Sequence, residues 1–513
     1  MPIRITGLNS GLDTESIISA LVSSYSYKTD KYKKAQTKLS WKQDAWKELN
    51  TKIYSLYKNV GNLKMSSAYN LRKTTISDTT KATVTAGSGV ANGSYSVQVT
   101  QLAKAGYLTG AKLKNATDES AKLTKDSTLA DLGYSGDGSF SITVGGQEKT
   151  ISVKSDTKIG DVLSQLSEAG VNASFDEKNQ RIFISSKEAG EANDFTLGGS
   201  EDILNALGIN AVADSSALTD EERSTKAIKE NAQGSIIYVN GAKFEGDTNT
   251  VTVNGLSIQA TGVTGDAYDP TGSNAFTVTV STDTEGIYDK IKDFLSQYNS
   301  LVNEMTRLYN ADSAKGYEPL TDEEKDAMSE TEVEKWEEKI KASLLRRDDT
   351  LSSVLATMTG AMSKSYEVNG KTYSLSSFGI QTLGFLNAPK NEHNAYHIDG
   401  DEDDANTSGK TDKLMAALNE DPDAVIGFMK ELTLGLYEAV DKKMKSTSLS
   451  SVYTVYNDKE MASEYSDYTS LIAKWEDRLE QQQEYYYDKF AQMETALSKL
   501  NSQTSSLSGL FGM

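Results

Sequence analysis

The sequence predicts an elongated α+β protein of several domains, in which helical chain ends enclose β-rich domains nested one inside another. Three observations support this fold class. Apolar residues recur with a seven-residue period near both ends of the chain, residues 74–283 are rich in Thr, Ser, Gly and Val, and helical patterns return after residue 284. Sustained heptads are typical of coiled coils and helical bundles, whereas strict alternation is typical of strands.

The first element is a long helix near the N-terminus. No glycine or proline falls between Leu12 and Val60, so nothing in that stretch interrupts a helix. The apolar row comprises Ile18, Tyr25, Tyr32, Leu39, Trp46, Ile53 and Val60. A second row, three residues further on, comprises Leu21, Ala35, Leu49, Leu56 and Leu63, with Lys28 and Lys42 as interruptions. We expect Asp13 or Thr14 to cap this helix and Gly61 to end it.

A second long amphipathic helix is expected at the C-terminus. Its apolar stripe comprises Ile472, Trp475, Leu479, Tyr486, Phe490, Met493, Leu497, Leu500, Thr504, Leu507 and Phe511. The step from Leu479 to Phe490 is eleven residues, which is a heptad plus a four-residue stutter. An isolated helix of this kind gains stability only when its stripe is covered. We therefore expect residues 1–40 and 475–513 to be mobile in the free protein.

Charge distinguishes the two terminal helices. Residues 28–58 hold nine lysines against Asp30, Asp44 and Glu48, whereas residues 458–500 hold ten acidic and five basic side chains. Opposite charge favours association of two helices. We therefore expect the chain ends to pair; the alternative is that each helix packs only on its own domain.

The central region is expected to be β-structure. Apolar residues alternate with polar ones around Val97, Ile142 and Val278, and two Asn-Gly pairs at 240–241 and 254–255 predict tight hairpins. Residues 139–185 are expected to form a small separate structural unit. It has two strands, then a helix with Ile159, Val162, Leu163 and Leu166 at helical spacing, then a further strand.

Helices are expected again after this region. Apolar residues between 287 and 308 are spaced alternately by four and three positions, which predicts one helix. A second helix is expected at residues 351–358, after the capping pair Asp349-Thr350, and a third at residues 425–440. A hairpin is expected at Asn369-Gly370. The predicted parts are terminal coiled-coil segments 1–40 plus 475–513, a helical domain 41–75 plus 284–474, a β-rich domain 76–125 plus 235–283, and an inserted outermost domain 126–234.

Composition excludes several functions. The chain of 513 residues carries a net charge of −20, which disfavours nucleic acid and anionic membrane surfaces as partners. It has no cysteine and two histidines, which leaves little for soft metal sites or nucleophile–base pairs. No run approaches the length of a membrane span, and the N-terminus lacks the pattern of a cleaved secretory signal. We expect no cofactor and no enzymatic activity.

The segment ITGLNSGLDTESIISALV runs from Ile5 to Val22. This segment resembles the start of one known family, the flagellar filament-capping proteins, also called flagellar hook-associated protein 2. Its motif positions are Gly7, Leu8, Ser10, Gly11, Leu12 and Asp13. Residues 93–105 resemble the segment that closes the family's N-terminal region, residues 319–339 resemble its helical-domain signature, and residues 139–185 resemble an inserted repeat of flagellins and caps.

This resemblance implies a structural role outside the cell, at the tip of the flagellum. It implies export through the flagellar secretion system and assembly into a ring, for which five subunits are our working hypothesis. The outer β-rich domains would form a plate and the helical domains its legs, while the terminal segments bind flagellin. The implied partners are further copies of the chain, flagellin, an export chaperone and, in an adhesion role, a host or surface receptor. The alternatives are another axial component, such as a hook–filament junction protein or a flagellin-like subunit, and a surface adhesin.

One loop has the residue types of a metal site. His393, His397 and Asp399 are followed by an acidic run to Asp404. A calcium loop needs glycine at its sixth position and glutamate at its twelfth, where this run has Asp404 and Lys410. We therefore expect a solvated acidic loop. The acidic residues 322–338 are likewise expected to form the solvated face of a helix that packs through Val333, Trp336 and Ile340.

Overall fold

The computed structural model describes residues 10–212 and 218–511, the last four by their backbone alone. The chain divides into two compact units. Met1–Tyr69 with Thr284–Met513 form the helical unit, and Asn70–Asp283 form the β-rich unit. The α+β fold class predicted from the sequence is confirmed.

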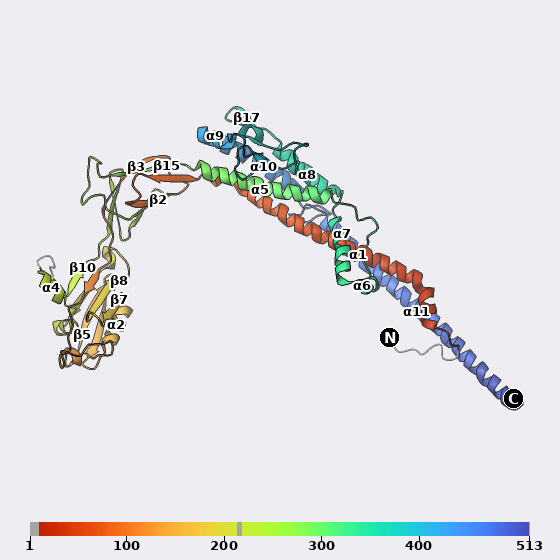
Figure 1. Ribbon diagram of the computed structural model, residues 1–513, viewed down its shortest axis with the longest axis horizontal. Coiled ribbons are helices and arrows are strands. Elements are labelled where there is room, and N and C mark those ends of the chain that lie inside the picture. Colours follow the sequence, from red (N-terminus) through yellow and green to blue (C-terminus); the bar gives the residue numbers. More distant parts are fainter. Residues whose placement is uncertain (1–9, 213–217, 512–513) are drawn as a thin grey trace. The chain divides into compact units, whose positions relative to one another are not determined.

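The helical unit is built on two long helices, α1 (Thr14–Leu63) and α11 (Asp458–Phe511), which lie side by side (Figure 1). The other helices are α5 (Thr284–Tyr309), α6 (Asp322–Asp326), α7 (Glu330–Ala342), α8 (Asp349–Met362), α9 (Lys413–Glu420) and α10 (Pro422–Lys443). The unit also has two short antiparallel strand pairs, β16 (Tyr366–Val368) with β17 (Lys371–Tyr373) and β18 (Ile380–Gln381) with β19 (His397–Ile398). The predicted hairpin at Asn369-Gly370 is the first of these.

The helix caps predicted for α1 and α8 are partly correct. Asp13 caps α1, because its carboxylate accepts a 3.1 Å hydrogen bond from the Ser16 backbone N–H. The predicted stop at Gly61 is wrong, since α1 continues to Leu63. A Cβ at Gly61 would lie 3.3 Å from the Tyr437 ring, so this glycine serves helix packing. The cap of α8 is Asp348 and not Asp349, with its carboxylate 3.1 Å from the Leu351 N–H.

One half of the β-rich unit surrounds an apolar core made mainly of Val, Ile, Leu and Ala side chains. Its strands are β1 (Arg72–Ile76), β2 (Ala82–Ala86), β3 (Gly93–Gln101), β11 (Ser235–Val239), β12 (Ala242–Gly246), β13 (Thr250–Val253), β14 (Leu256–Ala260) and β15 (Phe276–Thr282). They form antiparallel sheets in the orders β1-β15-β3-β11-β12 and β13-β14-β2. Asn240 and Asn254 have φ of 49° and 48°, as the two predicted Asn-Gly hairpins require.

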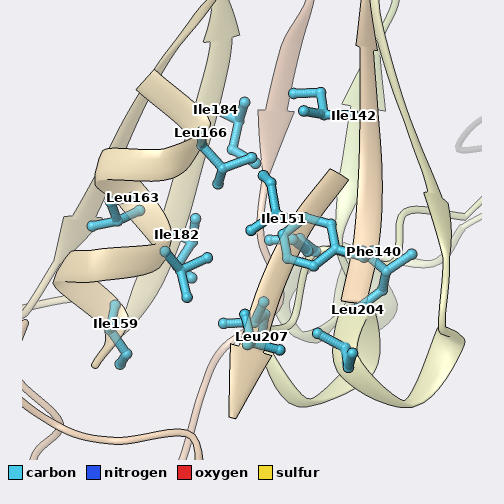
Figure 2. Close-up of a cluster of buried hydrophobic side chains, with 14 of the residues drawn as sticks. Phe140, Ile142, Ile151, Ile159, Leu163, Leu166, Ile182, Ile184, Leu204 and Leu207 are labelled. Carbon is cyan, nitrogen blue, oxygen red and sulfur yellow. The ribbon is translucent and has the colours of Figure 1, made fainter. Parts of the chain in front are cut away.

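The other half contains a second apolar core. Its elements are β4 (Tyr107–Thr109), β5 (Asp137–Val144), β6 (Gln147–Lys154), α2 (Ile159–Glu168), β7 (Val171–Asp176), β8 (Arg181–Ser186), β9 (Phe195–Gly199), α3 (Glu201–Ala206), α4 (Asp220–Thr225) and β10 (Ile228–Glu230). The sheet orders are β10-β4-β8-β7 and β6-β5-β9. Figure 2 shows Ile159, Leu163 and Leu166 of α2 beside strands that carry Ile182 and Phe140. The predicted order of two strands and a helix is confirmed, but two strands, β7 and β8, follow the helix where one was predicted.

The second core begins earlier in the chain than the predicted inserted domain. Leu108, Leu113 and Leu123 are buried in the same cluster as Phe140, and β4 pairs with β8. Residues 107–125 therefore contribute to this core. We accordingly propose that the outermost domain starts before residue 107 and not at 126; the four-part domain division as a whole stays a proposal.

Replacing Phe140 with alanine should destabilise this core. The side chain is 1% exposed, and a buried Phe→Ala change costs about 3–5 kcal/mol through lost burial and the cavity left behind. Hydrogen exchange of residues 137–154 in the full-length chain should accelerate accordingly. Phe385→Ala is the matched control, because that side chain is 79% exposed and its loss should leave the exchange unchanged. Equal protection in both variants would contradict the assigned core.

Candidate interaction site on the terminal helices

The two terminal helices run antiparallel. Tyr25 of α1 lies against Trp475 of α11, with ring centroids 6.3 Å apart, and Tyr32 lies 6.3 Å from Tyr468. Residue numbers therefore rise along α1 as they fall along α11. The pairing that opposite charge and heptads predicted is present between these helices.

Aromatic rings and lysines supply most of the specific contacts along this seam. Trp46 is 2% exposed and stacks at 5.3 Å and 9° on Tyr456, which lies two residues before the start of α11. The Lys28 ammonium lies 4.3 Å from the Trp475 ring centroid, a cation–π contact. Lys33 forms a 2.7 Å ion pair with Glu476, but both side chains are about half exposed. Exposed pairs contribute about 0–1 kcal/mol, so the rings hold the seam more than the charges do.

The predicted α1 residues divide between the seam and the surface. Ile18, Leu39, Trp46, Leu49 and Ile53 are buried, and Tyr25 and Tyr32 are half-buried. Leu21, however, is 45% exposed. This leucine belongs to the second predicted row, three residues after the first, which is not buried in the N-terminal part of α1.

The N-terminal part of α1 uses a different second row. Val22 is 2% exposed and Thr29 is 3% exposed, so the buried rows there are spaced by four residues and then three. Thr29 satisfies its hydroxyl by donating to the Tyr25 carbonyl at 3.1 Å, which frees its methyl group for burial. Lys28, which interrupts the predicted second row, was the sign in the sequence that this row was placed wrongly. Moving the second row by one residue replaces that lysine with Thr29.

The last part of α11 has no cover from α1 among the described residues. Ser10, just before α1, hydrogen-bonds Glu494, so α11 runs on past the start of α1 (Figure 1). Leu479, Tyr486, Phe490, Met493 and Leu497 are half-buried. Leu500 and Leu507 are 61% and 53% exposed. The side chain of Phe511 lies outside the described residues.

The N-terminal motif lies beside this uncovered end. Gly11 has φ of +67°, a conformation that glycine adopts without strain, and Leu12 is 46% exposed. Hydrogen bonds from the Ser16 hydroxyl and backbone N–H lower the pKa of Asp13, as suits an N-cap carboxylate. Gly7 and Leu8 lie outside the described residues.

The acidic loop at 393–404 is a network of ion pairs rather than a solvated run. Asp399 and Asp401 are 4% and 9% exposed. Lys410 lies 2.8 Å from Asp399, and Lys292 lies 2.6 Å from Asp401. Burial opposes ionisation of Asp399, but hydrogen bonds from Lys410 and Gln381 outweigh it and hold the pKa of this carboxyl below its usual value. The expectation of a solvated loop is therefore wrong for these two carboxylates.

A histidine of the same loop pairs with an acidic side chain. His397 Nδ1 lies 2.5 Å from Asp404. Between residues 10 and 511, leaving aside 213–217, no three His, Cys, Asp or Glu side chains gather as a metal would require. In α7, Ile340 is 1% exposed and Trp336 half-buried, as the predicted packing face requires. None of the described helices has the length and apolar character needed to span a bilayer.

Two family models match the chain. The model described as flagellar hook-associated protein 2 C-terminus covers residues 232–502, and the corresponding N-terminus model covers residues 10–106. The chain belongs to the flagellar hook-associated protein 2 family. It is therefore a component of the bacterial flagellum, as the resemblance implied.

Members of this family from other bacteria align over nearly the whole chain. The flagellar hook-associated protein 2 of Halalkalibacterium halodurans is 26% identical over 99% of this chain and 100% of its own length. The Escherichia coli protein of the same name is 24% identical over 99% and 98%. A crystal structure of the flagellar cap protein FliD D1-D2-D3 domains from Escherichia coli covers 78% of this chain and 96% of its own, at 19% identity and a TM-score of 0.48.

Substitutions at neighbouring positions test the observed seam. Val22→Asp should release the N-terminal part of α1 from α11, because it places a carboxylate where only 2% of the side chain is exposed and burial of an unpaired charge is costly. Leu21→Asp should leave the pair intact, because that position is 45% exposed. Hydrogen exchange of residues 14–30 and 470–490 is the measurement. Faster exchange in the Leu21 variant than in the Val22 variant would reverse the assignment.

Proposed function

We propose that this chain caps the growing flagellar filament: several copies form a ring at the distal tip, retain exported flagellin, and promote its folding and insertion. The proposal rests on membership of the flagellar hook-associated protein 2 family. The working stoichiometry is five copies. The site of action is extracellular, at the flagellum tip, and export follows the flagellar secretion route with a chaperone bound beforehand.

The observation that carries the proposal is the uncovered end of α11. An amphipathic helix whose leucines remain exposed gains free energy when a partner covers them. Leu500 and Leu507 are such residues, at 61% and 53% exposure. We propose that this segment, with the motif at Ser10 to Asp13 beside it, contacts the apolar terminal helices of flagellin.

The aromatic part of the seam suits reversible docking. Between Tyr25 and Leu39, half-buried tilted rings and an exposed ion pair flank the buried Thr29. Contacts of this kind are individually weak. The terminal segments 1–40 and 475–513 could then exchange their mutual contact for a contact with flagellin, which requires the mobility that remains a prediction from the sequence.

A second candidate function is another axial role, such as a hook–filament junction protein or a flagellin-like subunit. The same terminal helices would serve it. Adhesion to a host or surface receptor through the β-rich unit is a further role that is compatible with the cap. Electron microscopy of the purified chain separates these candidates, because a cap forms closed rings and a flagellin-like subunit forms filaments.

Removing the exposed leucines should abolish capping without unfolding the chain. We expect the double variant Leu500→Ser with Leu507→Ser to keep its ring and its helical content, because neither side chain is buried in the chain itself. Cells that carry it should grow short filaments and lose flagellin to the medium.

The matched control is Ser502→Ala with Ser505→Ala, which alters exposed residues of the same segment off the apolar stripe. It should support normal filaments. Filament growth that survives both the leucine substitutions and deletion of residues 475–513 would refute the proposed role of this helix.

A further inference from the structure

Two stretches of chain connect the two halves of the β-rich unit. The first half has the sheets β1-β15-β3-β11-β12 and β13-β14-β2, and the second half has the other two sheets of the unit. β3 leads into β4 of the second half, and β10 leads back into β11 of the first. The pairs β3–β11 and β4–β10 are both antiparallel. The segments between them, residues 102–106 and 231–234, form a two-stranded neck.

The neck is not a continuous ladder. Lys104 and Gln233 form one isolated antiparallel bridge, in which each backbone N–H donates to the carbonyl of the other, at 2.9 and 3.1 Å. Side-chain amides supply further links. Gln101 donates to the Gly234 carbonyl at 2.7 Å, and Gln233 Nε2 donates to the Leu102 carbonyl at 2.9 Å. Two strands without neighbours have little stability of their own, so the neck alone does not fix the angle between the halves.

A loop of the first half supplies a neighbour for the neck. It lies between β12 and β13, and its Asn249 binds both backbone groups of Ala103. The Ala103 N–H donates to Asn249 Oδ1 at 2.7 Å, and Asn249 Nδ2 donates to the Ala103 carbonyl at 3.1 Å. Ala103 is 6% exposed, and buried backbone groups require partners. The Asn249 amide therefore bonds to the neck as the backbone of a third strand would.

The same loop also meets the second half, at Gly190. This glycine lies shortly after β8, is buried, and donates its N–H to the Lys104 carbonyl at 3.3 Å. Its φ is +103°, and a Cβ at this position would lie 2.6 Å from the Cα of Asp247. Glycine is required here, because a methyl group would overlap the Asp247 backbone and φ is positive. Residues 247–249 therefore contact the neck and the second half at once.

These contacts can be released without unfolding either half. Asp247 is exposed and Asn249 is half-buried, so water can replace their partners, and such exchange leaves a neutral hydrogen bond with a small net contribution. Each half has its own apolar core, and no residue of the loop 247–249 belongs to either core. Loss of the loop contacts should therefore change the angle between the halves and leave the cores intact.

We propose that residues 247–249 are a latch that holds the two halves of the β-rich unit at one angle, and that the neck bends when the latch opens. Asn249 stiffens the neck, and the packing of Asp247 on Gly190 fixes the second half against the first. The latch is independent of the α1–α11 seam, which belongs to the other compact unit, and it does not rest on the proposed cap function.

Distances between two spin labels test the latch, because the chain has no cysteine of its own. The labels are attached to the full-length chain at Thr75→Cys on β1 and Thr150→Cys on β6, both exposed positions. With the latch intact we expect one narrow distance distribution. Asn249→Ala and Gly190→Ala, introduced separately, should each broaden this distribution, because each removes one of the two contacts of the latch.

The matched control is Gly89→Ala in the first half. A Cβ at Gly89 would have no atom within 4 Å, so this variant should keep the narrow distribution. Hydrogen exchange of residues 97–99 and 140–142, one stretch from each core, should be unchanged in all three variants. The proposal is overturned if Asn249→Ala keeps the narrow distribution, or if the unsubstituted latch already gives a broad one. Lost protection of either core in the Asn249 variant would equally overturn it, because the loop would then stabilise a core and not an angle.

Discussion

The antiparallel contact between α1 and α11 is the interaction on which the helical unit depends. It joins residues more than 400 positions apart, such as Tyr25 with Trp475, and so closes the unit around the excursion of the chain through Asn70–Asp283. Its firmest part is at Trp46, which is stacked on Tyr456 and 2% exposed. Toward Tyr25 and Tyr32 the rings are only half-buried. The aromatic contacts therefore lose cover toward the chain ends, although Val22 and Thr29 stay buried there.

This gradient connects the fold to the proposed function. Under the proposed function, a segment that binds flagellin must be ordered enough to present its apolar stripe, and part of that stripe must remain uncovered by the chain itself. The end of α11 meets the first condition because it is helical to Phe511. It meets the second because Leu500 and Leu507 stay exposed, so a partner gains their burial without first displacing another chain segment.

The sequence predicted the periodic features and the pairing of the two chain ends, but it did not predict the individual long-range contacts. Strand alternation, Asn-Gly hairpins and the first heptad row follow from local geometry, and the structure contains them. The prediction of the second buried row was wrong near Lys28. Thr29 is a polar residue, but it can be buried because its hydroxyl donates to the Tyr25 carbonyl. Gly61 looked like a stop, but it accommodates Tyr437. The partner of Asp401 is Lys292, 109 residues away, and no local pattern reveals such a pair.

Cysteine cross-linking tests the antiparallel pair most directly, because the natural chain has no cysteine to interfere. Ser10→Cys combined with Glu494→Cys should form an intramolecular disulfide in dilute protein, since these residues are in contact. Ser10→Cys combined with Glu460→Cys should not, since Glu460 lies near the other end of α11. A disulfide from the second pair, or from neither pair, would contradict the antiparallel seam.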